Sequence, residues 1–97
     1  MFRVEYADQV SDDFDRIVAH LLGHAVDDIA GRLADIQSAI GLLERNPDIG
    51  RPVDAGLREL VIGRGSRGYV ALYAVLNDEE LVLVLALKSQ SEAGYHG

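Results

Sequence analysis

The chain has no cysteine and no tryptophan, and only two of its 97 residues are proline. Without cysteine it forms no disulfide and offers no thiolate ligand, so a reducing cytoplasm is the simplest compartment for it. No apolar run approaches the length of about 18 residues that marks a membrane-spanning helix. The first ten residues also lack the basic region followed by an apolar run that marks a secretory signal. These absences favour a cytoplasmic protein with no membrane partner.

Positive charge is scarce, since nine Lys and Arg stand against 16 Asp and Glu and the net charge is −7. Residues 1–50 hold four Arg against ten acidic residues, a net of −6, whereas residues 51–70 hold four Arg against two acidic residues, a net of +2. Proteins that wrap nucleic acid present a broad basic surface. The charge pattern disfavours general DNA or RNA binding and leaves room for a local patch that contacts anions.

Ninety-seven residues make one domain, residues 1–97, with 48% hydrophobic residues to form its core. Apolar residues spaced by three and four predict two helices, the first between Asp8 and Gly23. The second ends before Asn46-Pro47, because proline disfavours helical angles in the residue that precedes it. The two stripes are Val10, Phe14, Ile17 and Leu21, then Val26, Ile29, Leu33, Ile36, Ile40 and Leu43.

Four strands are predicted around these helices. A short one covers residues 2–6, and a loop of about ten residues from Asn46 to Gly56 leads to three more. Those three cover residues 58–62, 69–76 and 81–87, and turn residues Asn77-Asp78 join the last two as a hairpin. The order β-α-α-β-β-β predicts an α+β fold, with a two-helix hairpin packed on one face of a small, mostly antiparallel sheet.

The strand of residues 69–76 is apolar on both faces, which is typical of a central strand. If the helices cover one face, the other is an open hydrophobic surface, and such surfaces mark interaction sites. We expect one alternating set of this strand to form it: Tyr69, Ala71, Tyr73 and Val75. A homodimer that hides the same face is an open alternative.

Four basic residues lie on or beside the last three strands and can converge on one edge of the sheet: Arg58, Arg64, Arg67 and Lys88. Clustered guanidinium groups suit phosphate, because their planar forks bind two oxygens at once. The alternative is that they are solvated charges, some of them paired with Glu59 or Glu92. Tyr95 either covers apolar surface or stacks on a base and transfers a proton.

Two further patterns lack the features of a site. The turn Gly63–Gly68 has no Lys-Ser/Thr pair and precedes a strand, so it is not a phosphate-binding loop of the P-loop type. His20 and His24 are four residues apart and Asp27-Asp28 follow, but a metal needs three or four ligands in fixed geometry. We therefore predict no metal site and no cofactor.

The chain resembles the RelE/ParE superfamily of toxins from bacterial type II toxin–antitoxin modules, which include plasmid-stabilisation systems. The resemblance rests on the order of elements and on the segments Asn46–Gly50, Gly56–Leu60, Gly68–Tyr73 and Gln90–Tyr95. It implies a toxin that is neutralised by a small cognate antitoxin, with Tyr69, Ala71, Tyr73 and Val75 as the antitoxin-binding set.

The superfamily contains two activities. RelE-type members cut messenger RNA on the ribosome without a metal, and the resemblance then implies Arg64, Arg67, Lys88 and Tyr95 as catalytic residues. ParE-type members bind DNA gyrase, for which the resemblance implies target contacts at Arg58, Arg64, Arg67 and Lys88.

The tail departs from the family pattern, because Ser89 and Ser91 stand where histidine and arginine are common. These departures and the net charge of −7 favour the ParE-like reading. The ribosome-dependent ribonuclease and a non-toxic interaction module are the alternatives.

Overall fold

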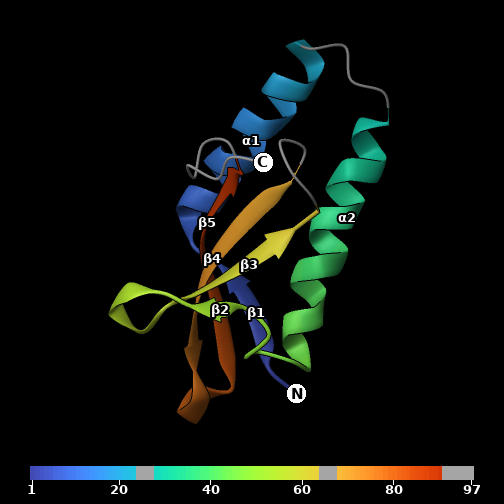
Figure 1. Ribbon diagram of the computed structural model, residues 1–97. Coiled ribbons are helices and arrows are strands. Elements are labelled where there is room, and N and C mark those ends of the chain that lie inside the picture. The colour runs from blue at the N-terminus through green and yellow to red at the C-terminus, as the bar shows by residue number, and fades with distance from the viewer. Residues whose placement is uncertain (24–27, 64–67, 91–97) are drawn as a thin grey trace.

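The computed structural model describes residues 1–23, 28–63 and 68–90. Within them two helices pack against a five-stranded sheet with strand order β1-β5-β4-β3-β2 (Figure 1). The elements are β1 (Arg3–Tyr6), α1 (Asp8–Gly23), α2 (Ile29–Gly41), β2 (Arg51–Pro52), β3 (Arg58–Ile62), β4 (Tyr69–Leu76) and β5 (Leu81–Ser89). The predicted α+β architecture is therefore confirmed.

The sheet is antiparallel except at one edge, where β1 pairs in parallel with β5. The predicted loop after the second helix contains two elements that the sequence did not indicate, a 3₁₀ turn over Asp54–Gly56 and the two-residue strand β2, which pairs with the start of β3. Its second residue, Pro52, has no N–H to donate to a ladder, which is typical of a short edge strand.

The helical stripes face the sheet as predicted. In α1, Val10, Ile17 and Leu21 are at most 4% exposed, and in α2, Ile36 and Ile40 are fully buried. After Gly41, α2 tightens into a 3₁₀ turn over Leu42–Glu44, before the chain reaches Pro47. Of the predicted second stripe, Val26 lies outside the described residues.

The helices cover the face of β4 that carries Tyr69, Ala71 and Tyr73, which are at most 7% exposed and belong to the hydrophobic core. Val75 packs against the same core. The expectation that these four residues form the open face is therefore wrong. Both sets of alternating residues in β4 are apolar, so hydrophobic periodicity alone does not decide which set meets the helices.

A buried carboxylate joins α1 to β5. Asp13 is 1% exposed, its Oδ2 accepts the N–H of Leu87 at 2.9 Å, and its Oδ1 accepts from Nη1 of Arg16 at 2.9 Å. Nη2 of Arg16 donates to the carbonyl oxygen of Leu87 at 3.1 Å. The two side chains therefore bind both polar groups of one peptide residue, beyond the point where pairing with β1 ends at Val84.

This arrangement also sets the charge of Asp13. Burial alone would raise the pKa of Asp13, but hydrogen bonds from Leu87, Arg16 and Gln9, together with the charge of Arg16, outweigh it and hold the pKa below its ordinary value. Asp13 thus stays ionised inside the core and keeps its two partners in place.

No helix within the described ranges is long and apolar enough to cross a membrane.

Candidate functional site

The face of the sheet turned away from the helices is a candidate interaction surface. Side chains alternate along a strand, so the residues opposite the core set lie on this outer face. Val61, on β3, is 45% exposed, whereas its cross-strand neighbour Val70 on β4 is 4% exposed. Further along the outer face, Leu72, Ala74 and Leu83 are half-buried. The outer-face apolar residues at the centre of the sheet are Val61, Leu72, Ala74 and Leu83, with Glu59 opposite Leu72 and Leu83 opposite Ala74.

Charged pairs border this apolar centre on both sides. On the β2–β3 side, Nη2 of Arg51 lies 2.7 Å from Oε1 of Glu59, and on β1, Nε of Arg3 lies 3.8 Å from Oε1 of Glu5. No helix or strand in the described part of the chain packs over it. An apolar centre with a polar rim is the usual composition of a protein–protein interface.

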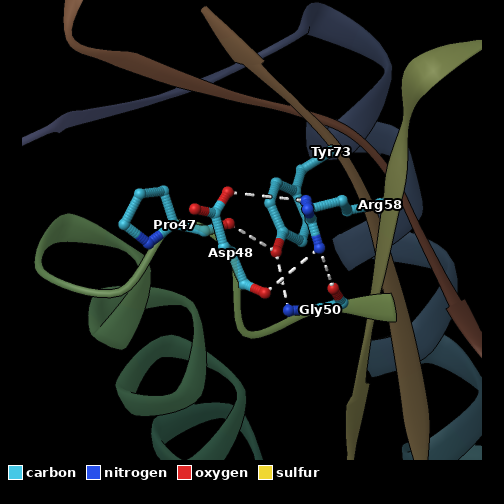
Figure 2. A network of polar contacts seen from close by, with 5 residues as sticks. All are labelled: Pro47, Asp48, Gly50, Arg58 and Tyr73. Atoms are coloured by element: carbon cyan, nitrogen blue, oxygen red, sulfur yellow. Dashed lines mark hydrogen bonds and ion pairs between the residues drawn. The ribbon is translucent and has the colours of Figure 1, made fainter. Parts of the chain in front are cut away.

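Arg58, one of the predicted anion contacts, lies elsewhere. Its Nη1 donates to the carbonyl oxygens of Gly50 at 2.7 Å and Asp48 at 3.1 Å, and its Nε lies 3.6 Å from Oδ1 of Asp48 (Figure 2). The hydroxyl of Tyr73 accepts the N–H of Gly50 at 2.8 Å and donates to the carbonyl oxygen of Pro47 at 2.7 Å. Arg58 and Tyr73 thus hold the loop of residues 46–50 against the sheet.

The network explains why a tyrosine sits in the core. Burial raises the pKa of the Tyr73 hydroxyl above its ordinary value, although the bond with Gly50 and the charge of Arg58 act in the opposite direction. The hydroxyl therefore stays protonated and can donate to Pro47. A Cβ at position 50 would lie 2.5 Å from this hydroxyl oxygen, so the close approach of loop and ring requires glycine.

The structure separates Arg58 from Lys88. Arg58 is opposite Tyr73 and shares the core-facing side of the sheet, whereas Lys88 is opposite Val70 on the outer face. They also lie at opposite ends of the β3–β4 hairpin, since Val70 is next to the turn and Tyr73 is paired with the first residue of β3. The predicted convergence of all four cations is therefore wrong for this pair. Arg64, Arg67 and Tyr95 lie outside the described residues.

Lys88 is exposed at the end of the open face, next to Ser89. Gln90, two residues after Lys88, is 8% exposed, and its backbone N–H donates to the carbonyl oxygen of Gly68 at 2.9 Å. Gly68 and Gln90 thereby fix the end of β5 against the start of β4, and with it the backbone that carries Lys88.

A metal site finds no support among the residues that the structure describes, where no three His, Asp or Glu side chains are grouped to hold an ion. Of the four residues considered in the sequence, His20 and Asp28 are described, and His24 and Asp27 are not. Asp28 caps α2, because its Oδ1 accepts the N–H of Gly31 at 3.1 Å.

Sequence reasoning missed the roles of Asp13 and of the Arg58–Tyr73 network. A signal for Asp13 existed, since it lies three residues after Val10 and four before Ile17, at the spacing of the buried stripe. A carboxylate at such a position needs a partner in the core. The network had no comparable signal, because its acceptors are backbone carbonyls of a loop.

Several solved structures share this fold. The chain of a chromosomal ParDE toxin–antitoxin system from P. aeruginosa matches with a TM-score of 0.75 and 22% identity, covering 92% of this chain and 96% of that one. The RelBE2 toxin–antitoxin complex from Mycobacterium tuberculosis matches with a TM-score of 0.60 and 21% identity, covering 91% and 96%. A metal-bound toxin from Helicobacter pylori matches with a TM-score of 0.52 and 15% identity, covering 95% and 98%.

At these identities the structural matches show the fold alone. A comparison with curated proteins finds no significant match. The family model described as ParE toxin of type II toxin–antitoxin system, parDE, matches residues 4–94, which is nearly the whole chain. The chain therefore belongs to the ParE toxin family of type II toxin–antitoxin systems.

Proposed function

We propose that the protein is a ParE-like toxin that acts by binding a protein target, with DNA gyrase as the first candidate, and that a cognate antitoxin neutralises it. The observation that carries this proposal is the open face of the sheet, with Val61, Leu72, Ala74 and Leu83 at its centre. Family membership supplies the toxin–antitoxin context, and the structural relatives include toxin–antitoxin complexes. We place the antitoxin on this outer face in place of the core-facing set around Tyr73.

The chemistry of the face favours a protein partner over nucleic acid. Its centre is aliphatic, and its bordering arginines already face carboxylates, since Arg51 pairs with Glu59 and Arg3 with Glu5. A partner that buries Val61 and Leu72 gains hydrophobic stabilisation of about 25 cal/mol per Å² of apolar surface removed from water. A phosphate backbone would instead meet a protein of net charge −7.

The second candidate is a RelE-type ribosome-dependent ribonuclease that uses Arg64, Arg67, Lys88 and Tyr95. Lys88 favours it, because this cation is exposed at the end of the open face. Arg58 does not separate the two candidates, since it is not in the catalytic set and its guanidinium is engaged with the carbonyl oxygens of Asp48 and Gly50. Ser89 and Ser91 remove two groups that the resemblance associates with the nuclease. A non-toxic interaction module of the same fold is the third candidate.

The test is pulse-labelling of DNA and protein synthesis in bacteria, in the minutes after the chain is induced alone. We expect DNA synthesis to fall first, and the purified protein to inhibit gyrase supercoiling. Collapse of protein synthesis before DNA synthesis would establish the ribonuclease instead, and Lys88→Ala would then abolish it. No effect on either process would leave the interaction module.

A surface variant connects the outcome to the open face. Val61→Asp places a charge at the centre of this face, where Val61 is 45% exposed, and we expect it to abolish both toxicity and antitoxin binding while the protein stays folded. Leu42→Asp is the matched control, because Leu42 is an apolar residue that is 55% exposed in the turn after α2. Equal behaviour of the two variants would remove the open face from the proposal.

A further inference from the structure

A row of three residues crosses the open face at the end nearest the turn between β3 and β4. Lys88 of β5 pairs with Val70 of β4, and Val70 pairs with Val61 of β3. Neighbouring strands are about 4.8 Å apart, which places the backbone of Lys88 about 10 Å from that of Val61. Val70 is 4% exposed, so Val61 and Lys88 are the members of the row that a partner can reach. An aliphatic side chain and a cation therefore lie within the span of one partner segment.

Lys88 differs from the two arginines of this face because it has no counter-charge. Arg51 lies beside Glu59. Arg3 lies beside Glu5. Lys88 is exposed, and it has no ion-pair partner in the part of the chain that the structure describes. An uncompensated cation at the border of an apolar surface favours a partner that carries negative charge at the matching point.

Gln90 holds a hydrogen-bond donor that the described residues leave unused. Its backbone bond to Gly68 continues the register of β4 and β5 by one step, so its side chain lies on the same face as that of Lys88. A Cβ added to Gly68 would collide with Nε2 of Gln90, which shows that the amide lies over this glycine. Nε2 is buried and finds no acceptor among the described residues. A buried N–H without an acceptor costs free energy, which a partner recovers by supplying an oxygen.

The amide of Gln90 can meet a partner by turning about its last side-chain bond. This torsion is broad and roughly two-fold, so the nitrogen and oxygen exchange places while the rest of the side chain stays where it is. Residues two apart in a strand are about 6.6 Å apart, a gap that the long stem of Lys88 can span. The ammonium and the amide can therefore bind the two oxygens of one carboxylate.

We propose that Lys88 and Gln90 form a carboxylate-binding subsite of the open face, which takes an Asp or Glu side chain of the protein target next to an apolar residue that packs on Val61. The inference rests on the proposed function, because it names the chemistry of the target at the same face. Phosphate is the poorer ligand, since clustered guanidinium groups suit it best and Arg58 lies on the opposite face. A nucleic acid would also meet a net charge of −7.

The experiment measures binding of the full chain to purified DNA gyrase, without nucleic acid, by titration calorimetry. Lys88→Glu reverses the free charge at an exposed position, so we expect the fold to persist and the Kd to rise about tenfold or more at low salt. Arg45→Glu is the matched control, because it makes the same charge change at an exposed position after α2, and its Kd should stay within about threefold. If the two variants bind gyrase equally, the inference is overturned while the proposed function stands.

Gln90→Met tests the amide, because methionine has a similar length and no donor. The donor has no acceptor in the free chain, so the melting temperature should stay equal or rise, whereas the Kd for gyrase should rise about threefold to tenfold. A residue that serves the fold alone would show the reverse, a lower melting temperature with an unchanged Kd, and that result would overturn the role of Gln90.

A double-mutant cycle tests whether the two side chains share one ligand. Lys88→Met removes the charge and keeps most of the stem, and its combination with Gln90→Met should lose less binding free energy than the sum of the two single losses. Strictly additive losses would assign the two residues to separate partners and overturn the shared subsite.

Two further outcomes separate this inference from the proposed function. If the wild-type chain does not bind gyrase, the proposed function fails and the inference fails with it. If the wild-type chain instead binds an RNA oligonucleotide, and Lys88→Glu abolishes that binding, the ligand of Lys88 is a phosphate and the inference is overturned.

Discussion

Replacing Asp13 with alanine tests whether a buried carboxylate holds the first helix to the last strand. The variant leaves the N–H of Leu87 without its acceptor at a residue that is fully buried, which costs about 1–3 kcal/mol. It also removes the ion pair with Arg16, whose side chain is 44% exposed, so this part adds only about 0–1 kcal/mol. The expected loss in the free energy of unfolding is about 1–4 kcal/mol.

Urea denaturation followed by circular dichroism measures this loss, and the melting temperature should fall by about 4–30 °C. Asp12→Ala is the matched control, because Asp12 is the neighbouring exposed carboxylate, and it should stay within about 0.5 kcal/mol of the wild type. An Asp13→Ala protein that is as stable as the Asp12→Ala protein would refute the reasoning.

The same carboxylate makes a prediction about pH. The pKa of Asp13 is lower in the folded protein than its ordinary value, so its contribution is complete above the unfolded-state pKa of about 4 and is lost as the pH falls through the folded-state pKa. Asp13→Asn should therefore flatten the acid limb of the stability curve below about pH 4, where the wild type loses stability. Parallel acid limbs for the two proteins would contradict this assignment.

Three further substitutions examine the Arg58–Tyr73 network and its glycine. Tyr73→Phe removes a hydroxyl that serves Gly50 and Pro47, and should cost about 1–3 kcal/mol in urea denaturation; an effect as small as that of Tyr6→Phe would contradict the network. Gly50→Ala places a Cβ 2.5 Å from the hydroxyl oxygen of Tyr73 and should cost about 1–3 kcal/mol. Gly41→Ala, which has open space around it, should instead be neutral or stabilising by up to about 1 kcal/mol in the same assay, and a loss there would count against the helix geometry.

The sequence was sufficient for the parts of the fold that depend on periodicity. Spacing alone predicts the helical stripes through Val10 and Ile36, because one side of each helix packs on the core and the other faces solvent. It also predicts the central position of β4, because a strand that is apolar on both faces is typical of the middle of a sheet. The choice between the two faces of β4 did not follow, since Tyr73 and Leu72 are both apolar enough for a core. On the core-facing side, the backbone of the loop of residues 46–50 supplies partners for the Tyr73 hydroxyl.

The candidate site was predicted less well than the fold. An open apolar face was anticipated, but its residues are those around Val61 and Leu72. The grouping of Arg58 with Lys88 was wrong, because the register of β3, β4 and β5 puts them on opposite faces. The prediction placed both residues near one edge of the sheet, but the order of the strands does not give the face to which each side chain points.

The parallel pairing of β1 with β5 has a consequence for how the protein is made. Arg3 of β1 aligns with Leu81 of β5, so β1 cannot pair until β5 is present. Asp13 of α1 depends on Leu87 in the same way. Contacts between residues so distant in sequence slow folding, because a long chain loop must close before they form. During translation the first helix therefore has no partner strand until residues 81–89 have left the ribosome, and the apolar residues of α1 stay available to other proteins until then.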